Sequence, residues 1–114
     1  MELAHIVEIV NGRVICGEEK LRRTVTYGFS SDLMSDVLTI NIEDLMLITG
    51  LTNPQTIRTA EMADIEFILF VRNKKITPEM IKLAKENDMV LIVTGYSLFR
   101  TSGLLYNAGL KPVY

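Results

Sequence analysis

Three short runs of apolar residues, separated by segments with helical patterns, constrain the fold more than any other feature of the sequence. The runs are Leu45–Ile48, Phe67–Val71 and Met89–Val93, and the helical segments lie near Pro54–Ala63 and Pro78–Asn87. Strands that are apolar throughout are typical of a sheet covered on both faces, and a helical connection joins strands that run parallel. Because such strands are usually neighbours joined by right-handed crossovers, the spacing predicts βαβ units.

The remaining segments predict elements that flank these units. Within one of them Val25, Tyr27 and Phe29 alternate with other residues, which predicts a strand with these three side chains on one face. The further elements expected are a helix over residues 3–10 ended by Asn11-Gly12, two flanking strands at Arg13–Gly17 and Thr24–Phe29, a short helix from Ser30-Ser31-Asp32 through Leu38, and a last helix capped by Ser97 and ended by Gly109.

Length and composition are those of one folded domain. With 114 residues, of which 48% are hydrophobic and 23% are charged, the chain is long enough to bury a single core. Together with the strand spacing, these values predict a single small α/β domain over residues 1–114. Its central sheet is expected to be mainly parallel and flanked by helices.

Charge and hydropathy exclude several classes of partner. The net charge of −2 leaves no basic excess to neutralise a nucleic acid backbone, so no nucleic acid is expected. No apolar run approaches the roughly 18–20 residues of a membrane span, and Glu2, His5 and Glu8 replace the cationic start of a secretion signal. Cys16 is the only cysteine, which suits a reducing compartment. We therefore expect a cytoplasmic protein that does not enter the membrane.

The stretch from Leu45 to Asp64 has the pattern most typical of a binding site. Thr49-Gly50 ends the first apolar strand, Asn53 has the residue type of a helix N-cap, and Pro54 takes the first helical position. A strand, a turn and a capped helix start leave free main-chain amides at the carboxyl edge of a sheet, where the helix dipole is positive. This arrangement favours a small anionic ligand.

Three strand exits are expected along one edge of the sheet, namely Thr49-Gly50, Arg72-Asn73-Lys74 and Thr94-Gly95-Tyr96. Ligands of open α/β sheets bind outside the carboxyl ends of the strands. A lining of cationic and hydroxyl groups suits a phosphate or a carboxylate. The residues expected to bind it are Thr49, Gly50, Asn53, Gln55, Thr56, Arg58, Thr59, Arg72, Lys74, Thr94 and Tyr96, with Ser97 beside them.

Two of these residues also have a purely structural interpretation. Asn53 followed by proline is first of all a helix start, and such caps are common in loops that bind nothing. Arg58 lies within the first turn and a half of the helix, close enough to reach the strand exits. It is equally compatible with a solvated arginine paired with Glu61 or Glu66.

Other reactive side chains are expected to be structural. Asp32 and Asp36 are four residues apart, so both carboxylates would share a helix face and could bind a metal or act as acid and base. The favoured interpretation is a helix-start residue and a surface charge, and no metal site is expected. Cys16 is expected to be a small buried hydrophobe, and His5 a surface residue.

The sequence lacks the short motifs of the common enzyme classes. It contains no GxxxxGK[ST], GxGxxG, GxSxG or HExxH pattern. Its one histidine and one cysteine are the only materials for a Cys/His nucleophile pair, and the predicted topology gives no reason to bring them together. We therefore expect no enzymatic activity, and the sequence names no cofactor.

Three runs of residues resemble a known family. They are the run from Ser31 to Leu38 (SDLMSDVL), the run from Leu47 to Glu61 (LITGLTNPQTIRTAE), and Phe70-Val71-Arg72. The chain resembles, over nearly its whole length, the DRTGG domain, whose fold is similar to the N-terminal domain of HPr kinase/phosphorylase. Domains of this family also occur attached to phosphotransacetylases and to CBS-domain regions, and the resemblance therefore implies a regulatory or ligand-sensing module.

The resemblance assigns no catalytic residues, because none are established for the family. The chain also differs from the family pattern at two strand exits. Gly50-Leu51-Thr52 stands where Gly-Asp-Arg is expected, and Arg72-Asn73-Lys74 stands where Thr-Gly-Gly is expected.

Two functions follow from these observations. The first is a non-catalytic regulatory or sensor module that binds a small anionic ligand, a nucleotide or a phosphate-like group, at the carboxyl edge of the sheet. The second is a protein-interaction or dimerisation module without a small-molecule ligand. In either case the high apolar content of a short chain favours a homo-oligomer, most simply a dimer.

Overall fold

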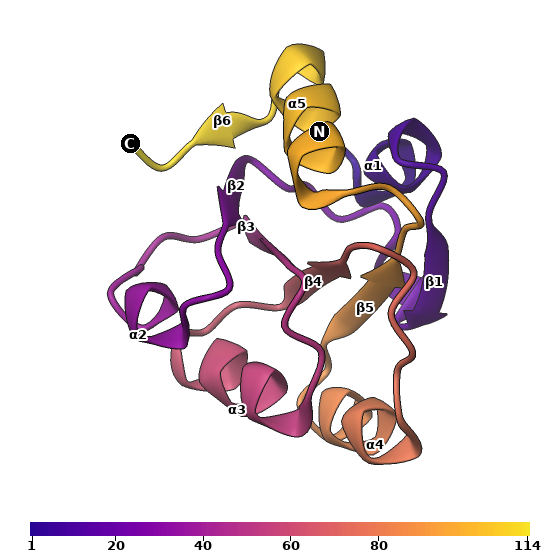
Figure 1. Ribbon diagram of the computed structural model, residues 1–114, viewed down its shortest axis with the longest axis vertical. Helices are drawn as coiled ribbons and strands as arrows, with labels where there is room; N and C mark the ends of the chain where they lie inside the picture. The colour runs from indigo at the N-terminus through magenta and orange to yellow at the C-terminus, as the bar shows by residue number, and fades with distance from the viewer.

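A mixed sheet with helices on both faces makes up the fold, and the computed structural model describes residues 1–114 of the chain (Figure 1). The elements in chain order are α1 (Leu3–Ile9), β1 (Arg13–Cys16), the 3-10 helix η1 (Glu18–Lys20), β2 (Tyr27–Ser30), α2 (Met34–Val37), β3 (Leu45–Thr49), α3 (Pro54–Met62), β4 (Phe67–Phe70), α4 (Pro78–Glu86), β5 (Val90–Val93), α5 (Leu98–Ala108) and β6 (Lys111–Pro112).

The strands lie in the order β1-β5-β4-β3-β2-β6. Strands β2 to β5 follow one another in parallel, and β6 adds in parallel to the outer side of β2. Only β1 is antiparallel, beside β5. The predictions of an α/β fold and of a mainly parallel sheet are therefore confirmed, and β1 and β2 flank the three apolar strands as expected. The two-residue strand β6 was not predicted.

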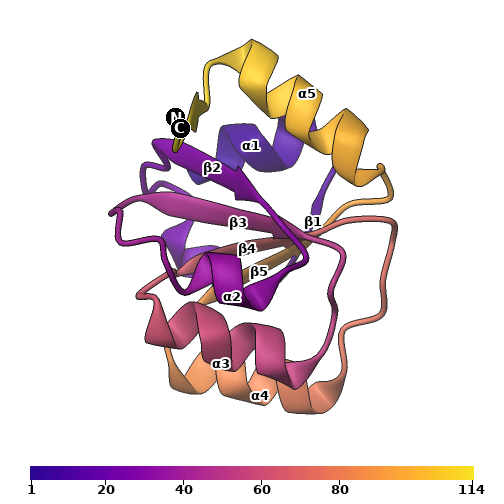
Figure 2. The same ribbon diagram turned by 60° about the vertical axis from the view of Figure 1, so that its left-hand side comes forward.

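Burial explains why the three central strands are apolar throughout. Every residue of β3, β4 and β5 is buried. Successive side chains of a strand point to opposite faces, so Leu45 and Leu47 pack with α2, α3 and α4, while Met46 and Ile48 pack with α1 and α5. Figure 2 shows these two helical layers on either side of the sheet.

The last helix places its first turn at the carboxyl edge of the sheet. After β5 the chain crosses to the opposite face from α2, α3 and α4, and α5 leads back to β6 beside β2 (Figure 2). Ser97 caps α5 through a hydrogen bond from the amide of Arg100 to its hydroxyl, and Gly109 ends the helix with a φ of 112°. The start of α5 therefore faces the region where the parallel strands end.

The prediction for Val25 is wrong. The strand begins only at Tyr27, and Val25 is buried on the α1 and α5 side, whereas Tyr27 and Phe29 pack on the other side. The amide of Val25 donates to the carbonyl of Met1, so this residue pairs with the start of the chain and not with the sheet. None of the helices is long and apolar enough to cross a membrane.

Candidate functional site at the strand exits

The carboxyl ends of three parallel strands and the start of α5 surround one hollow, which we call the strand-exit hollow. Its volume is about 320 Å³. The residues come from the exits of β2, β3 and β4 and from the first turn of α5. They are Asp32, Gly50, Val71, Arg72, Ser97, Leu98 and Phe99.

Asp32 joins the exit of β2 to the exit of β3. Its Oδ1 accepts hydrogen bonds from the amide of Gly50 at 2.7 Å and from the hydroxyl of Thr49 at 2.9 Å. The Gly50 amide lowers the pKa of Asp32, burial opposes this, and the Thr49 hydroxyl and the charge of Arg72 lower it further. The carboxylate is therefore charged at neutral pH, and both side-chain hydrogen bonds end on Oδ1.

Arg72 lies against the main chain of Gly50. A Cβ atom on Gly50 would stand 3.0 Å from Nη2 of Arg72 and 3.6 Å from Oδ2 of Asp32. The glycine thus lets the guanidinium and the second carboxylate oxygen approach the same point of the main chain. This places a positive and a negative group side by side in the hollow.

The backbone around Arg72 is held in an uncommon conformation. Arg72 and Asn73 both have positive φ angles, 62° and 52°, which non-glycine residues adopt rarely. Their amides donate to the carbonyls of Tyr96 and Thr94, both at 2.8 Å. The exit of β5 therefore fixes the exit of β4, and the position of the Arg72 backbone is determined by two hydrogen bonds.

The first turn of α5 adds main-chain donors and an aromatic ring to the hollow. Helix geometry leaves the amides of Leu98 and Phe99 without a carbonyl partner in the helix, and the dipole makes this end positive. The Phe99 side chain is 90% exposed at the rim. An anionic group would find main-chain donors here, beside the exposed ring of Phe99.

The start of α3 is capped by Asn53. Oδ1 of Asn53 accepts the amide of Thr56 at 3.0 Å, and the Thr56 hydroxyl donates to the carbonyl of Leu51 at 2.8 Å. Thr59 is buried and Gln55 is exposed. None of these four polar residues of the first crossover lines the hollow.

Arg58 points toward the neighbouring helix α4. Its Nη2 lies 3.7 Å from Oε1 of Glu79, and it does not line the strand-exit hollow. The expected pairing with Glu61 or Glu66 is wrong, because Glu66 pairs with Lys20 and Arg23 at 3.2 Å each.

The predicted residues of the third exit, Thr94 and Tyr96, make contacts within the protein and do not line the strand-exit hollow. The hydroxyl of Thr94 donates to the carbonyl of Val10 at 2.6 Å and accepts the amide of Tyr96 at 3.2 Å. The centre of the Tyr96 ring lies 3.7 Å from Cζ of Arg100. Lys74 is half-buried. Of the predicted binding residues, the structure gathers Thr49, Gly50 and Arg72 around Asp32, with Ser97 beside them.

The sequence interpretation of Asp32 as a helix-start residue is wrong. Helix α2 begins at Met34 after Leu33, and the hydroxyl of Ser31 accepts the amide of Leu33 at 3.0 Å. Asp32 belongs instead to the exit of β2, a fourth parallel strand. Recognising Tyr27–Ser30 as a parallel strand would have placed Asp32 at the same edge as the other three exits.

Neither the acidic side chains nor the cysteine form a reactive cluster. No group of three or more His, Cys, Asp or Glu side chains is placed to hold a metal ion. Cys16 is buried, as expected, and burial raises the pKa of its thiol. Its Sγ lies 3.8 Å from the carbonyl of Met89, at the opposite edge of the sheet from the hollow.

Comparisons with known proteins agree with this architecture. The family model of the DRTGG domain matches residues 5–108. A crystal structure of the CBS and DRTGG domains of the regulatory region of Clostridium perfringens pyrophosphatase, complexed with the activator diadenosine tetraphosphate, superposes with a TM-score of 0.71 at 18% identity. The match covers 91% of this chain and 45% of that chain, so this chain spans less than half of it. The search of curated proteins gave no significant match.

Proposed function

Since the chain belongs to the DRTGG domain family, we propose that it is a non-catalytic regulatory module that binds a small anionic ligand, a nucleotide or phosphate-like group, in the strand-exit hollow. The observation that carries this proposal is the placement of Arg72 against Gly50, beside the first turn of α5. A guanidinium and a helix start at one point complement a phosphate or carboxylate.

The Arg72 guanidinium is not engaged in an ion pair. Lys20, Arg23 and Arg58 each pair with a glutamate, whereas Arg72 takes part in none of the three ion pairs of the structure. Its charge lowers the pKa of Asp32 without a direct ion pair. The guanidinium therefore retains donors for a bound anion.

The related structure supports a regulatory role. The pyrophosphatase region is described as regulatory and is complexed with an activating nucleotide, and it contains CBS as well as DRTGG domains. The fold that this chain shares with it favours a sensor over an enzyme. That this chain binds a nucleotide or a phosphate, and that it catalyses no reaction, is what we propose.

The proposal is tested by calorimetric titration of the protein with pyrophosphate and with AMP. We expect Arg72→Ala to weaken the binding of both by roughly ten- to a hundredfold, because a hydrogen bond to a charged group contributes on the order of 1.5–3 kcal/mol. Lys75→Ala is the matched control, since Lys75 is exposed in the same loop and does not line the hollow. Unchanged affinity in Arg72→Ala, or no binding of either compound, would contradict the proposal.

The non-catalytic part has a separate test. Purified protein should show no kinase, phosphatase or ATPase turnover. Steady turnover that survives repurification and is lost in Asp32→Asn would make the protein an enzyme and the strand-exit hollow its active site.

A second candidate function is a protein-interaction or dimerisation module, favoured by exposed apolar side chains around α2. Leu33 and Leu38, which flank α2, are 57% and 48% exposed, and Met62 on the contacting helix α3 is 70% exposed. A two-fold copy is the simplest cover for such a surface. This function predicts a dimer at high micromolar concentration in sedimentation, a return to monomer in Leu38→Lys, and no response to pyrophosphate or AMP.

A further inference from the structure

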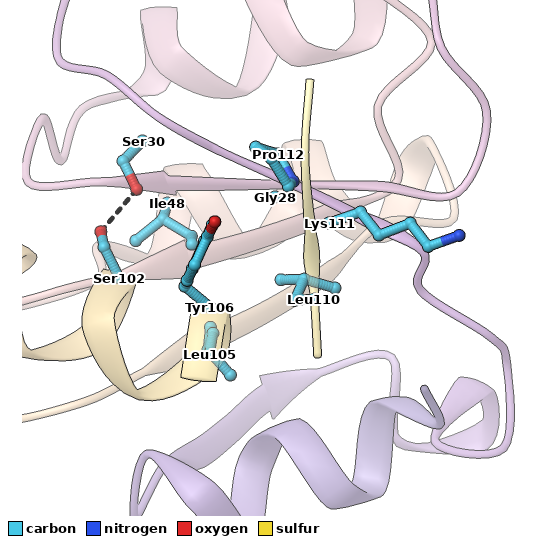
Figure 3. A pocket seen from close by; sticks show the side chains of 9 residues that line it. All are labelled: Gly28, Ser30, Ile48, Ser102, Leu105, Tyr106, Leu110, Lys111 and Pro112. Carbon is cyan, nitrogen blue, oxygen red and sulfur yellow. Dashed lines mark hydrogen bonds between the residues drawn. The ribbon is translucent and has the colours of Figure 1, made fainter. Parts of the chain in front are cut away.

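A second hollow lies between strand β2, helix α5 and the short edge strand β6 (Figure 3). We call it the β2–α5 hollow, and its volume is about 180 Å³. Its lining comes from all three elements and from the end of β3. The residues are Gly28, Ser30, Ile48, Ser102, Leu105, Tyr106, Leu110, Lys111 and Pro112.

The lining combines an apolar base with hydroxyl groups. Leu105 and Leu110 are buried and provide apolar surface. The hydroxyls of Ser30 and Ser102 lie 2.6 Å apart and are hydrogen-bonded to each other, as Figure 3 shows. Tyr106, which is 68% exposed, contributes an aromatic ring and a third hydroxyl. A flat heterocycle with polar edges fits this combination better than a charged group does.

The two hollows have no lining residue in common, but both take residues from β2 and β3 or their exits and from helix α5. Ser30 lines one and Asp32 lines the other, two residues apart at the exit of β2. On α5, Leu98 and Phe99 belong to the strand-exit hollow and Ser102 begins the β2–α5 hollow. At 1.5 Å of rise per residue, the centres of these two helical stretches are separated by roughly 9 Å. This is the scale of a nucleotide measured from its phosphate to its base.

The second carboxylate oxygen of Asp32, Oδ2, restricts the kinds of anionic ligand that the strand-exit hollow can bind. Both of its side-chain hydrogen bonds end on Oδ1, and Oδ2 faces the same point as the Arg72 guanidinium. A bare phosphate in this hollow would be attracted by Arg72 and repelled by Asp32. A sugar hydroxyl donates to a carboxylate, as in many dinucleotide sites, so a phosphate joined to a sugar gains from both residues.

Resting on the proposed function, we propose that the ligand is a nucleoside phosphate that spans both hollows. The phosphate lies beside Arg72 and the first turn of α5, a sugar hydroxyl donates to Oδ2 of Asp32, and the base occupies the β2–α5 hollow against Tyr106. The Ser30 and Ser102 hydroxyls face the edge of the base.

Calorimetric titration with a series of four compounds tests this inference. The compounds are pyrophosphate, ribose 5-phosphate, AMP and adenosine. We expect AMP to bind about tenfold more tightly than ribose 5-phosphate, because stacking of one base on an aromatic side chain has about that effect. Tyr106→Ala should remove this gain and leave ribose 5-phosphate binding unchanged. Tyr114→Ala is the matched control, since Tyr114 is 90% exposed and lines neither hollow.

Two further variants separate the parts of the ligand. Asp32→Asn should strengthen pyrophosphate binding severalfold, because the repulsion is removed, and should weaken ribose 5-phosphate binding relative to pyrophosphate. Phe99→Ala should leave the gain from the base in place, and loss of that gain in Phe99→Ala but not in Tyr106→Ala would overturn the inference.

The outcomes distinguish this inference from the proposed function. If pyrophosphate binds and depends on Arg72, but AMP binds no more tightly than ribose 5-phosphate, the anion site stands and the nucleoside assignment is wrong. If none of the phosphate compounds binds, both are wrong.

Discussion

The carboxylate of Asp32 accepts the main-chain N–H of Gly50 at 2.7 Å, which ties the exits of two neighbouring parallel strands together. The amide at the end of β3 is one of the donors that a bound anion would otherwise use. Because Asp32 already occupies it, an external anion is directed away from the Gly50 amide and toward Arg72 and the start of α5. The protein thus carries its own anion beside a cation that takes part in no ion pair.

Asp32→Asn should make the stability of the protein less dependent on acid pH. The folded state lowers the pKa of Asp32 below its ordinary value of 3.8, so its stabilising contribution is complete above that value and is lost as the pH falls through the lowered pKa. Asparagine can still accept the Gly50 amide, and the expected loss at about pH 7 is on the order of 1 kcal/mol or less for this exposed group.

Urea unfolding of both proteins over a range of pH checks this prediction. The difference between wild type and Asp32→Asn should be largest near neutral pH and should shrink below about pH 4. Burial raises the pKa of Glu66, but the hydrogen bonds and charges of Lys20 and Arg23 together outweigh it, so this pKa is also lowered. Glu66 is unchanged in both proteins, so its contribution cancels in the difference. A difference that grows on acidification would contradict the prediction.

Gly50→Ala should affect binding more than stability. The added Cβ would lie 3.0 Å from Nη2 of Arg72, the far end of a flexible side chain, so the guanidinium can move aside at a small cost. We expect a loss of less than about 1 kcal/mol in the free energy of unfolding. Displacement of Arg72 should weaken pyrophosphate binding at least severalfold.

Gly95→Ala is the matched control for this glycine. It also follows a parallel strand at the same edge, but a Cβ there would meet nothing within 4 Å. Thermal unfolding and calorimetric titration of the two variants should show similar stability and a loss of binding in Gly50→Ala alone. Equal binding in both variants would show that the close approach of Arg72 to Gly50 plays no part in anion binding.

The parts of the fold that were predictable are those that local sequence determines. The continuous apolar runs are typical of strands covered on both faces, and these runs form β3, β4 and β5. Asn53-Pro54 and Thr77-Pro78 each combine an N-cap with a proline at the first helical position, and each cap side chain accepts an amide of the first helical turn. Such signals require no knowledge of distant residues.

The site was less predictable because it depends on which distant segments meet. Asp32 and Gly50 are 18 residues apart, and their contact requires β2 to pair in parallel with β3. Strand β2 contains Gly28 and is only half-buried, so its sequence lacks the continuous apolar pattern of an inner strand. The direction of Arg58 depends on the packing of α3 against α4, which the local pattern of either helix does not determine.

Arg58→Ala should leave ligand binding unchanged. Its guanidinium pairs with Glu79 at 3.7 Å, and both side chains are about half exposed or more. Exposed pairs of this kind contribute about 0.2–1 kcal/mol. A double-mutant cycle with Glu79→Ala should measure a coupling within that range, while titration with pyrophosphate should give the wild-type affinity. Weakened binding in Arg58→Ala would place the anion at the start of α3 instead of beside Arg72.

Gly17→Ala should destabilise the fold more than any other glycine-to-alanine change. Gly17 has a φ of 88°, and a Cβ there would lie 2.9 Å from the Cα of Val90 and 3.0 Å from the carbonyl oxygen of Met89. These atoms belong to the main chain of a central strand and its approach, and they cannot move aside as a side chain can. The variant therefore combines an unfavourable backbone conformation with a main-chain overlap.

Gly109→Ala separates these two effects. Gly109 has a φ of 112°, but a Cβ there would meet nothing within 4 Å. Alanine should therefore lower the free energy of unfolding only through its unfavourable backbone conformation, by about 1–2 kcal/mol. Because the overlap at Val90 adds to the same term, Gly17→Ala should lower the free energy of unfolding by at least about 1 kcal/mol more, the low end of the cost of overpacking. Urea unfolding of both variants measures the difference. Equal losses would mean that the loop after β1 moves away from β5 without cost, and that Gly17 is required for its backbone conformation alone.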